Sequence, residues 1–498
     1  MVADRRRLLV AGLAYFLVLL WVASNFGTWA DEEYTLATTA HGAAYAFHRA
    51  ITYELQAPLY FVILALWRAV NMSIWFARLF SLLCATGLFF ALAKIAQRVA
   101  PRRDPIPFAL LASINPFVLV AALQIRLYSF ALLLSALLYL CFDYGFANGN
   151  SKRARIGFLL LAISGIYVQY FLGFMLVGFG CALLVRAQWT VLRTYVLYGV
   201  AIAVAALPLV GLARGQAVGY IPATSSHFNL IYRASLHPWL EFLIPHLYRP
   251  GDESSFEHLL YLALAFVIAA CCVWSQPNWT RKLVATIATA AAIEFVYVAV
   301  SAGLSESLND RYYIALFVPV AVAVYAFLRS STANPPVPQQ ILVTVLTIMT
   351  LASVISQYRF LAQNGDWIRV AEYLEAHARP GDLIAIYTSD NLPAFERQFH
   401  GNVRVVPFPR PNRSDRYLLS AIDIASPAQA KAAFATLPPY DTLWFVDAVQ
   451  CLKAAPEYGC DALHQAEADD FRVGTSKTFY TNAVYELIRR GGPAGGPK

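Results

Sequence analysis

Residues 5–26 read RRRLLVAGLAYFLVLLWVASNF, and residues 28–34 continue as TWADEEY. Three arginines followed by about nineteen uncharged residues predict a membrane-spanning helix that starts on the cytoplasmic side. No small-residue cleavage site follows this run, so we expect an uncleaved helix rather than a signal peptide. The three consecutive carboxylates Asp31, Glu32 and Glu33 then lie just beyond the outer end of this span.

The composition of the whole chain also indicates a membrane protein. Of its 498 residues, 59% are apolar and 14% are charged, and the mean hydropathy is +0.53. These values exclude a disordered, collagenous or disulfide-rich protein. The net charge of +8 does not indicate nucleic acid binding, because much of the excess positive charge falls in loops expected to be cytoplasmic. The sequence has no nucleotide-binding or zinc-binding motif.

Further apolar runs bring the predicted number of membrane spans to about eleven. They cover residues 74–96, 106–123, 129–146, 156–171, 172–185, 194–212, 257–274, 283–301, 312–328 and 341–356. The run at 57–70 is predicted to be an interfacial helix within a first outer loop at 27–73, since its crossing would place the basic loops outside. A second long outer loop is expected at 214–256.

After residue 356 the composition becomes that of a soluble domain. Strands are predicted at 382–388, 403–408, 442–446 and 484–488, and helices at 366–378 and 427–436. We therefore expect an α-helical multi-span membrane domain at 1–356 and a small extracytoplasmic α/β domain at 357–498, which ends in a flexible Gly/Pro tail. Cys451 and Cys460 fall in the second domain, and their spacing leaves open whether they form a disulfide.

The few charged and polar residues expected on the outer face are the candidates for chemistry. Carboxylates 31–33 repel one another beside a hydrocarbon boundary, which favours a base among them; the alternative is a solvated acidic loop. Arg126 and Arg311 lie beside Tyr128 and Tyr312, so they either flank an anionic group or anchor helix ends at the interface. The remaining candidates are polar residues at the end of an apolar run or inside one: Gln169 and Glu294.

Several short motifs follow one another in a recognisable order. They are Asp31-Glu32, Gln56-Ala57-Pro58-Leu59-Tyr60-Phe61, Arg78-Leu79-Phe80-Ser81, Gln124-Ile125-Arg126-Leu127-Tyr128 and Arg311-Tyr312. In this order and spacing they resemble the GT-C superfamily of integral-membrane glycosyltransferases. The most similar branch contains protein O-mannosyltransferases, the aminoarabinose transferase of lipid A and rhizobial lipopolysaccharide glycosyltransferases.

The resemblance implies a hexosyl- or mannosyl-type transferase that uses a polyprenyl-phosphate-sugar donor and inverts the anomeric carbon. The acceptor would be a hydroxyl of a glycolipid, polysaccharide or protein at the periplasmic face of a bacterial inner membrane. Asp31 would be the general base, Glu32 would orient the acceptor or the base, and Arg126 and Arg311 would bind the donor phosphate. Residues that would line the substrate are Glu33, Gln56, Tyr60, Arg78, Tyr128, Gln169, Tyr312 and Glu294.

Relatives often carry histidine where this chain has Gln56 and Gln169. Without these imidazoles a divalent metal is less expected, and it is left open; no other cofactor is expected. The alternative function is a membrane transporter or flippase for a lipid-linked or anionic substrate, which predicts broken helices and polar residues throughout the spans.

Overall fold

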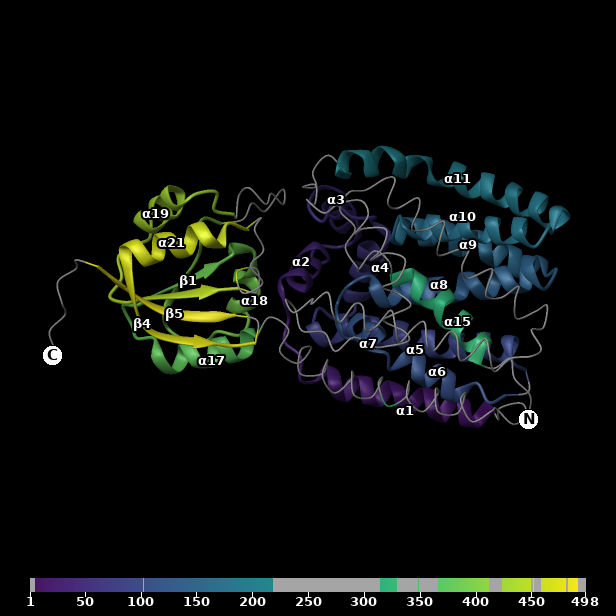
Figure 1. Cartoon of the computed structure of the whole chain (residues 1–498), viewed down its shortest axis with the longest axis horizontal. Coiled ribbons are helices and arrows are strands. Elements are labelled where there is room, and N and C mark those ends of the chain that lie inside the picture. Colours follow the sequence, from purple (N-terminus) through teal and green to yellow (C-terminus); the bar gives the residue numbers. More distant parts are fainter. Residues whose placement is uncertain are drawn as a thin grey trace. The chain divides into compact units, whose positions relative to one another are not determined.

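The computed structural model describes residues 5–101, 103–217, 314–328, 348, 366–411, 423–448, 451, 458–480 and 482–490 (Figure 1). The chain divides into two compact units. The helical unit comprises Met1–Ser24, Thr38–Ile51 and Leu55–Gln357, and the second unit comprises Asn25–Ala37, Thr52–Glu54 and Tyr358–Lys498. The predicted spans at 257–274 and 283–301, and that at 341–356 apart from residue 348, lie outside the described residues.

The helical unit contains several helices with the length and composition of membrane spans. Among the described residues four qualify, or five if one bent pair counts as a single span. The four are α1 (Arg5–Ala23), α5 (Ile74–Val99), α8 (Tyr128–Phe142) with its π-helical continuation at Asp143–Ala147, and α11 (Trp189–Ala217). The total of about eleven spans stays a prediction.

The other helices of this unit are shorter. They are α3 (Ala43–Thr52), α4 (Leu59–Arg68), α6 (Ile106–Ser113), α7 (Pro116–Leu123), α9 (Lys152–Val168), α10 (Leu172–Val185) and α15 (Phe317–Leu328). Helix α10 has the bounds that the sequence predicts, and α4 corresponds to the run predicted to be interfacial.

Helix α5 is central to the packing of the helical unit. It packs against α8, α6, α1, α7, α15 and α4. Its approach to α1 depends on Gly12, because a Cβ atom at that position would lie 2.3 Å from Cζ of Phe90. By contrast, α1 and α11 expose rows of large apolar side chains, such as Leu13, Leu17 and Val204. An apolar outer surface of this kind suits contact with lipid.

The apolar run at 106–123, which the sequence predicts to be one span, forms two short helices separated by a bend. Helices α6 and α7 meet at a bend of 66°. Pro116 cannot continue a preceding helix, and the Asn115 carboxamide oxygen accepts a hydrogen bond from the backbone N–H of Phe117 at 3.0 Å. A proline preceded by a capping residue therefore accounts for the break between α6 and α7.

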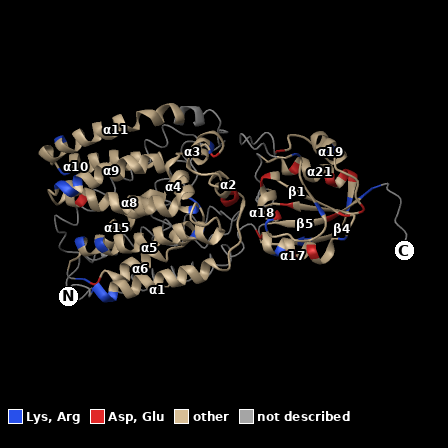
Figure 2. Ribbon diagram, turned by 180° about the vertical axis from the view of Figure 1, so that it is seen from behind, with Lys and Arg blue, Asp and Glu red and all other residues tan. Residues whose placement is uncertain are grey.

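Basic residues gather at the end of the helical unit where the chain begins (Figure 2). Arg7 pairs with Asp104 at 3.4 Å, which joins the start of α1 to the loop before α6. Arg98, in the last turn of α5, pairs with Asp143 at the end of α8 at 2.8 Å. The start of α1, the end of α5 and the end of α8 therefore lie at one end of the helical unit.

The second unit is built on a five-stranded sheet of order β2-β1-β3-β5-β4. Its strands are β1 (Leu383–Tyr387), β2 (Arg404–Pro407), β3 (Leu443–Asp447), β4 (Phe471–Thr478) and β5 (Ala483–Arg489). Strand β1 pairs in parallel with β2 and β3, whereas β5 pairs antiparallel with β3 and β4. β1 and β3 are buried along their whole length, as expected for interior strands covered on both faces.

Helices cover both faces of this sheet (Figure 1). α17 (Trp367–His377) and α18 (Leu392–Glu396) pack on the face that carries Ile384 and Ile386. α19 (Pro427–Ala435) and α21 (Cys460–Asp470) pack on the face that carries Leu383 and Ala385. This alternation follows from the two-residue period of a strand. Cys451 and Cys460 form a disulfide, a pairing that the sequence left open. The disulfide lies in the core between the sheet and helices α19 and α21.

Candidate active site

The three consecutive carboxylates lie in the first turn of a short helix, α2 (Ala30–Thr38). Acidic residues stabilise this end of a helix because its first N–H groups carry partial positive charge. Glu32 adds a capping contact, since its Oε2 accepts a hydrogen bond from the backbone N–H of Trp29 at 3.3 Å. Glu32 and Glu33 are buried, whereas Asp31 is half-buried.

Glu33 is held by an arginine from the opposite end of the chain. Nε and Nη2 of Arg397 donate to Oε1 and Oε2 of Glu33, each at 2.5 Å. This hydrogen bonding raises the pKa of Arg397. Arg397 follows α18 directly, so this contact ties α2 to the loop and helix that leave β1. The carboxylate of Glu33 therefore has a defined partner within the second unit.

A second contact with α2 involves the turn that follows β1. The Tyr34 hydroxyl donates to the backbone carbonyl oxygen of Asp390 at 3.3 Å. The Asp390 side chain is buried and accepts hydrogen bonds from the Thr388 hydroxyl and, at 3.1 Å, from the Asn391 amide. Burial raises the pKa of Asp390 to about 6, and the negative charge of Asp31 adds to this increase. A buried carboxyl group with a raised pKa therefore lies beside α2.

The carboxyl ends of β1 and β3 form a topological switch point. After β1 the chain continues into α18, which packs with α17 on one face, and after β3 it continues to α21 on the other face. In open α/β sheets, ligands bind at such points, outside the carboxyl ends of the strands. Asp390 follows β1 and Asp447 ends β3, so both acids lie at this edge.

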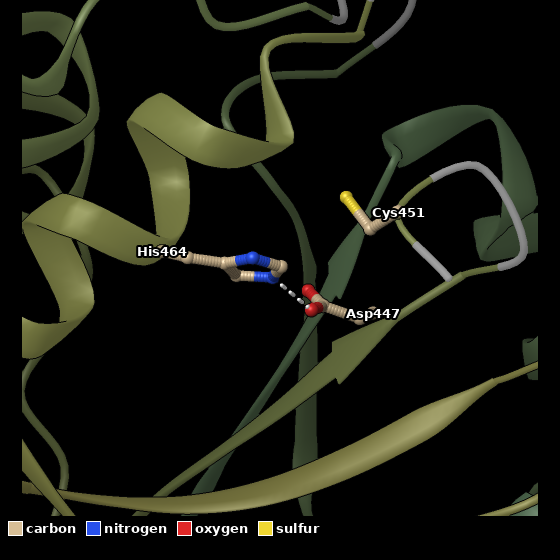
Figure 3. A group of neighbouring side chains, drawn as sticks. All are labelled: Asp447, Cys451 and His464. Carbon is tan, nitrogen blue, oxygen red and sulfur yellow. Dashed lines mark hydrogen bonds and ion pairs between the residues drawn. The ribbon is translucent and has the colours of Figure 1, made fainter. Parts of the chain in front are cut away.

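Asp447 forms an ion pair with His464 of α21 (Figure 3). The ring N–H at Nε2 of His464 donates to Oδ2 of Asp447 at 2.7 Å. This bond raises the pKa of His464, whereas burial raises the pKa of Asp447 and His464 opposes that effect. Burial and the charge of Asp447 also raise the pKa of Glu467 well above its usual value. Asp447 and Glu467 are thus two neighbouring acids, and Asp447 is paired with His464.

A sulfur atom lies beside this pair. The Cys451 sulfur, a carboxylate oxygen of Asp447 and a ring nitrogen of His464 lie within 4.8 Å of one another (Figure 3). A cysteine binds metal as a thiolate, and the sulfur of Cys451 is bonded to that of Cys460 instead. In the disulfide form these three side chains therefore lack the ligand set of a metal centre.

Arginines are also buried within the helical unit. Arg78 of α5 is 2% exposed, and its Nη1 donates to the backbone carbonyl oxygen of Ala23 at 3.4 Å. At 1.5 Å per residue, Arg78 lies about 30 Å along α5 from Arg98. It is therefore at the end of the helical unit opposite the basic residues Arg7 and Arg98. A buried charge in a membrane segment is costly and usually marks a functional site.

Three other predicted residues lie at the same end as Arg78. Arg126 is buried in the segment between α7 and α8, and Tyr128 is the first residue of α8. The other end of α8 is joined to Arg98 through Asp143. Gln169 is buried where α9 ends, and its backbone N–H donates to Gly165 at 2.8 Å. The structure therefore brings arginines and polar side chains predicted from separate motifs to one end of the helical unit.

The remaining predicted residues have different outcomes. Tyr60 of α4 is fully buried, with its ring centroid 6.2 Å from that of Phe80 on α5. Gln56 is half-buried, and its backbone N–H donates to Ala50 at 3.0 Å. The candidates that lie outside the described residues are Arg311, Tyr312 and Glu294.

Sequence reasoning did not find Asp390 or Arg397. Arg397 is separated from Glu33 by 364 positions, and nothing in its local sequence distinguishes it from other arginines of the soluble domain. The usable signal is that Asp390 follows a buried strand, where ligand-binding residues of α/β domains occur.

No protein-family model and no curated protein sequence matches the chain. It is similar to the crystal structure of ArnT from Cupriavidus metallidurans bound to undecaprenyl phosphate, with 14% identity, a TM-score of 0.49, and coverage of 99% of this chain and 100% of that one. It is also similar to the oligosaccharyltransferase AglB from Archaeoglobus fulgidus in complex with an inhibitory peptide and a dolichol-phosphate, with 11% identity, a TM-score of 0.45, and coverage of 97% and 75%.

A third similar structure is the arabinofuranosyltransferase AftD from Mycobacteria, with 13% identity, a TM-score of 0.48, and coverage of 98% of this chain and 42% of that one. The names of AglB and AftD describe them as transferases. At these TM-scores, function has to be inferred from the arrangement of this chain's own residues.

Proposed function

We propose that this protein is an integral-membrane glycosyltransferase that moves a sugar from a polyprenyl-phosphate donor to an acceptor hydroxyl. The observation that carries the proposal is the acidic helix α2, which follows the first apolar helix. Within this helix, Glu32 caps the first turn and Glu33 pairs with Arg397. Asp31 is the half-buried member of the three and is the residue that the motif resemblance assigns as the base.

In this reaction the acceptor oxygen attacks the anomeric carbon of the donor sugar. The bond from that carbon to the phosphate oxygen breaks, the acceptor proton passes to Asp31, and polyprenyl phosphate leaves. Displacement from the opposite face inverts the anomeric configuration. Arg126 and Arg311 would stabilise the phosphate that departs, and Arg78 is a third candidate because it is a buried cation near Arg126's end of the unit.

The proposed site is at the outer, periplasmic face of a bacterial inner membrane. The basic end of the helical unit would then face the cytoplasm, as the excess of arginine and lysine there favours. The disulfide between Cys451 and Cys460 supports an oxidising compartment for the second unit. Acceptors compatible with this position are glycolipids, polysaccharides and proteins of the cell envelope.

The test is the substitution Asp31→Asn, which removes the base and keeps the size of the side chain. Loss of a general base typically lowers the rate about 10²- to 10⁴-fold. Mass spectrometry of surface glycans, from cells that express equal amounts of each variant, should show loss of a sugar in Asp31→Asn. The control is Asp469→Asn, an exposed acid on α21 that pairs with Lys431. An unchanged glycan profile in Asp31→Asn would refute the catalytic role.

A transporter or flippase is the second candidate function, and the 66° bend between α6 and α7 favours it. Broken helices are typical of transporters that bind substrates near the membrane midplane. Purified protein in vesicles distinguishes the two functions. A flippase moves labelled polyprenyl-phosphate sugar between leaflets without covalent change, whereas a transferase forms a glycosylated acceptor and free polyprenyl phosphate.

A further inference from the structure

Two contacts attach α2 to the segment that follows β1. Arg397 binds both carboxylate oxygens of Glu33 at 2.5 Å, and the Tyr34 hydroxyl donates to the carbonyl oxygen of Asp390 at 3.3 Å. Glu33 and Tyr34 are adjacent, so their side chains leave the helix about 100° apart. Contacts on two sides fix both the position of α2 and its rotation about its own axis.

The ion pair between Arg397 and Glu33 differs from an ordinary surface pair. The Glu33 side chain is only 5% exposed, whereas that of Arg397 is 39% exposed. The guanidinium fork matches the carboxylate with two parallel hydrogen bonds, which fixes direction as well as distance. A buried carboxylate that loses its partner is strongly destabilised where it lies. Glu33 would therefore turn towards water, and α2 would turn with it.

We propose that Arg397 is a positioning residue for the transfer reaction, holding α2 in the rotation that directs Asp31 towards the acceptor hydroxyl. This inference rests on the proposed function, because it needs Asp31 to be the base. Glu33 lies two positions after Asp31, about 200° around the helix. Arg397 therefore acts through α2 and does not touch the reacting atoms.

The role of the second unit follows from this inference. α18 and the turn before it are short segments fixed to the buried strand β1. The sheet thus provides a rigid support for a helix that precedes it by more than three hundred residues. In this arrangement the α/β domain contributes to catalysis by aligning the base.

The first measurement separates rate from binding in the full-length protein, purified in detergent. A misplacement of a reacting group by about 1 Å lowers a rate about 10²-fold. Arg397→Gln should therefore lower kcat for transfer about 10²-fold and leave KM for the polyprenyl-phosphate-sugar donor unchanged. Arg397→Lys keeps the charge without the fork and should give an intermediate kcat. Arg404→Gln, at an exposed arginine of β2, is the matched control and should keep the parent kcat.

The second measurement does not depend on activity. Amide hydrogen exchange of the same preparations, read by mass spectrometry, reports how firmly α2 is held. Arg397→Gln and Glu33→Gln should each raise exchange in α2 at least about tenfold, and the double variant should be no worse than either single one. Exchange in β1 and β3 should stay at the parent level, which shows that the domain is folded. The exchanged pair Glu33→Arg with Arg397→Glu should restore slow exchange and part of kcat.

The possible outcomes separate this inference from the proposed function. Full kcat in Arg397→Gln, with Asp31→Asn inactive, would overturn the positioning role and leave the transferase proposal standing. Full activity in Asp31→Asn would overturn the proposed function, even with loosened α2 in Arg397→Gln. A fall in kcat matched by faster exchange in β1 and β3 would show a folding defect and would also overturn the positioning role.

Discussion

The buried carboxyl group of Asp390 predicts a specific dependence of stability on pH. Its pKa is about 6 in the folded protein, against 3.8 for an ordinary aspartate. Below pH 4 the group is protonated in both folded and unfolded chains. Between pH 4 and 6 the unfolded chain loses this proton while the folded chain keeps it, so folding stability falls as pH rises. At 1.36 kcal/mol per pKa unit the loss is about 3 kcal/mol, complete above pH 6.

The substitution Asp390→Asn should remove this loss. Asparagine cannot ionise, and its carboxamide oxygen can still accept the hydrogen bonds that Thr388 and Asn391 donate to Asp390. The variant should therefore be more stable than the parent at pH 7, and the advantage should disappear at pH 4. For a domain of this size, about 3 kcal/mol corresponds to a Tm increase on the order of 10 °C.

The assay is thermal unfolding of the full-length protein in detergent, at half-unit steps from pH 4 to pH 8. Asp441→Asn, at an exposed aspartate, is the control and should leave the pH dependence of Tm unchanged. Asp31→Asn should shift the transition of the parent to lower pH, because the charge of Asp31 contributes to the raised pKa of Asp390. A parallel pair of pH curves for the parent and Asp390→Asn would refute the assignment of a raised pKa.

Two further predictions concern the other side of the sheet. Replacing Cys451 and Cys460 by alanine opens a loop that spans 9 positions. The unfolded chain then has greater conformational freedom, so the unfolding free energy should fall by about 2.6 kcal/mol, measured as a lower urea midpoint. An unchanged midpoint would contradict the disulfide. His464→Ala should lower stability by about 1 kcal/mol at pH 5, a modest value because the His464 side chain is 43% exposed. This contribution is fully present below pH 6.5 and is lost as pH rises through the raised pKa of His464, so equal effects at pH 5 and pH 9 would contradict the ion pair with Asp447.

Segments that bury an uninterrupted apolar run were predictable from the sequence. β1, β3 and β5 lie within one residue of the predicted strands, and α17 and α19 match the predicted helices closely. Each of them carries a local pattern, either a short apolar run or a capping residue before a helical period. For these segments the local preference and the final structure agree.

Other elements were missed for physical reasons. β4 was not predicted because its side chains after Phe471 are exposed, so the strand shows no apolar pattern. α21 was not predicted because it has many acidic residues and only a narrow apolar face. Both elements are stabilised by contacts with segments that are close in space: β4 pairs with β5, and α21 packs on the sheet. A short window of sequence does not include those segments.

The candidate site shows the same limit. The acidic triplet and Arg126 were singled out because charges beside apolar runs are rare and conspicuous, whereas Arg78 was identified only through its family motif. The pairing of Glu33 with Arg397 was not, because it joins residues 364 positions apart, and sequence periodicity describes only near neighbours. Contacts of that kind depend on the assembled fold.

The second unit takes its residues from both ends of the chain, and this has a consequence for biosynthesis. The ribosome makes Glu33 364 positions before Arg397, and Tyr34 356 positions before Asp390. While the residues between them are made and inserted, α2 therefore lacks both of these contacts. A chain that stops before Asp366 can insert α1 and still lacks them. An aligned acidic helix is thus a property of chains that extend through Arg397, and unfinished or clipped molecules in the membrane would hold the same carboxylates without their support.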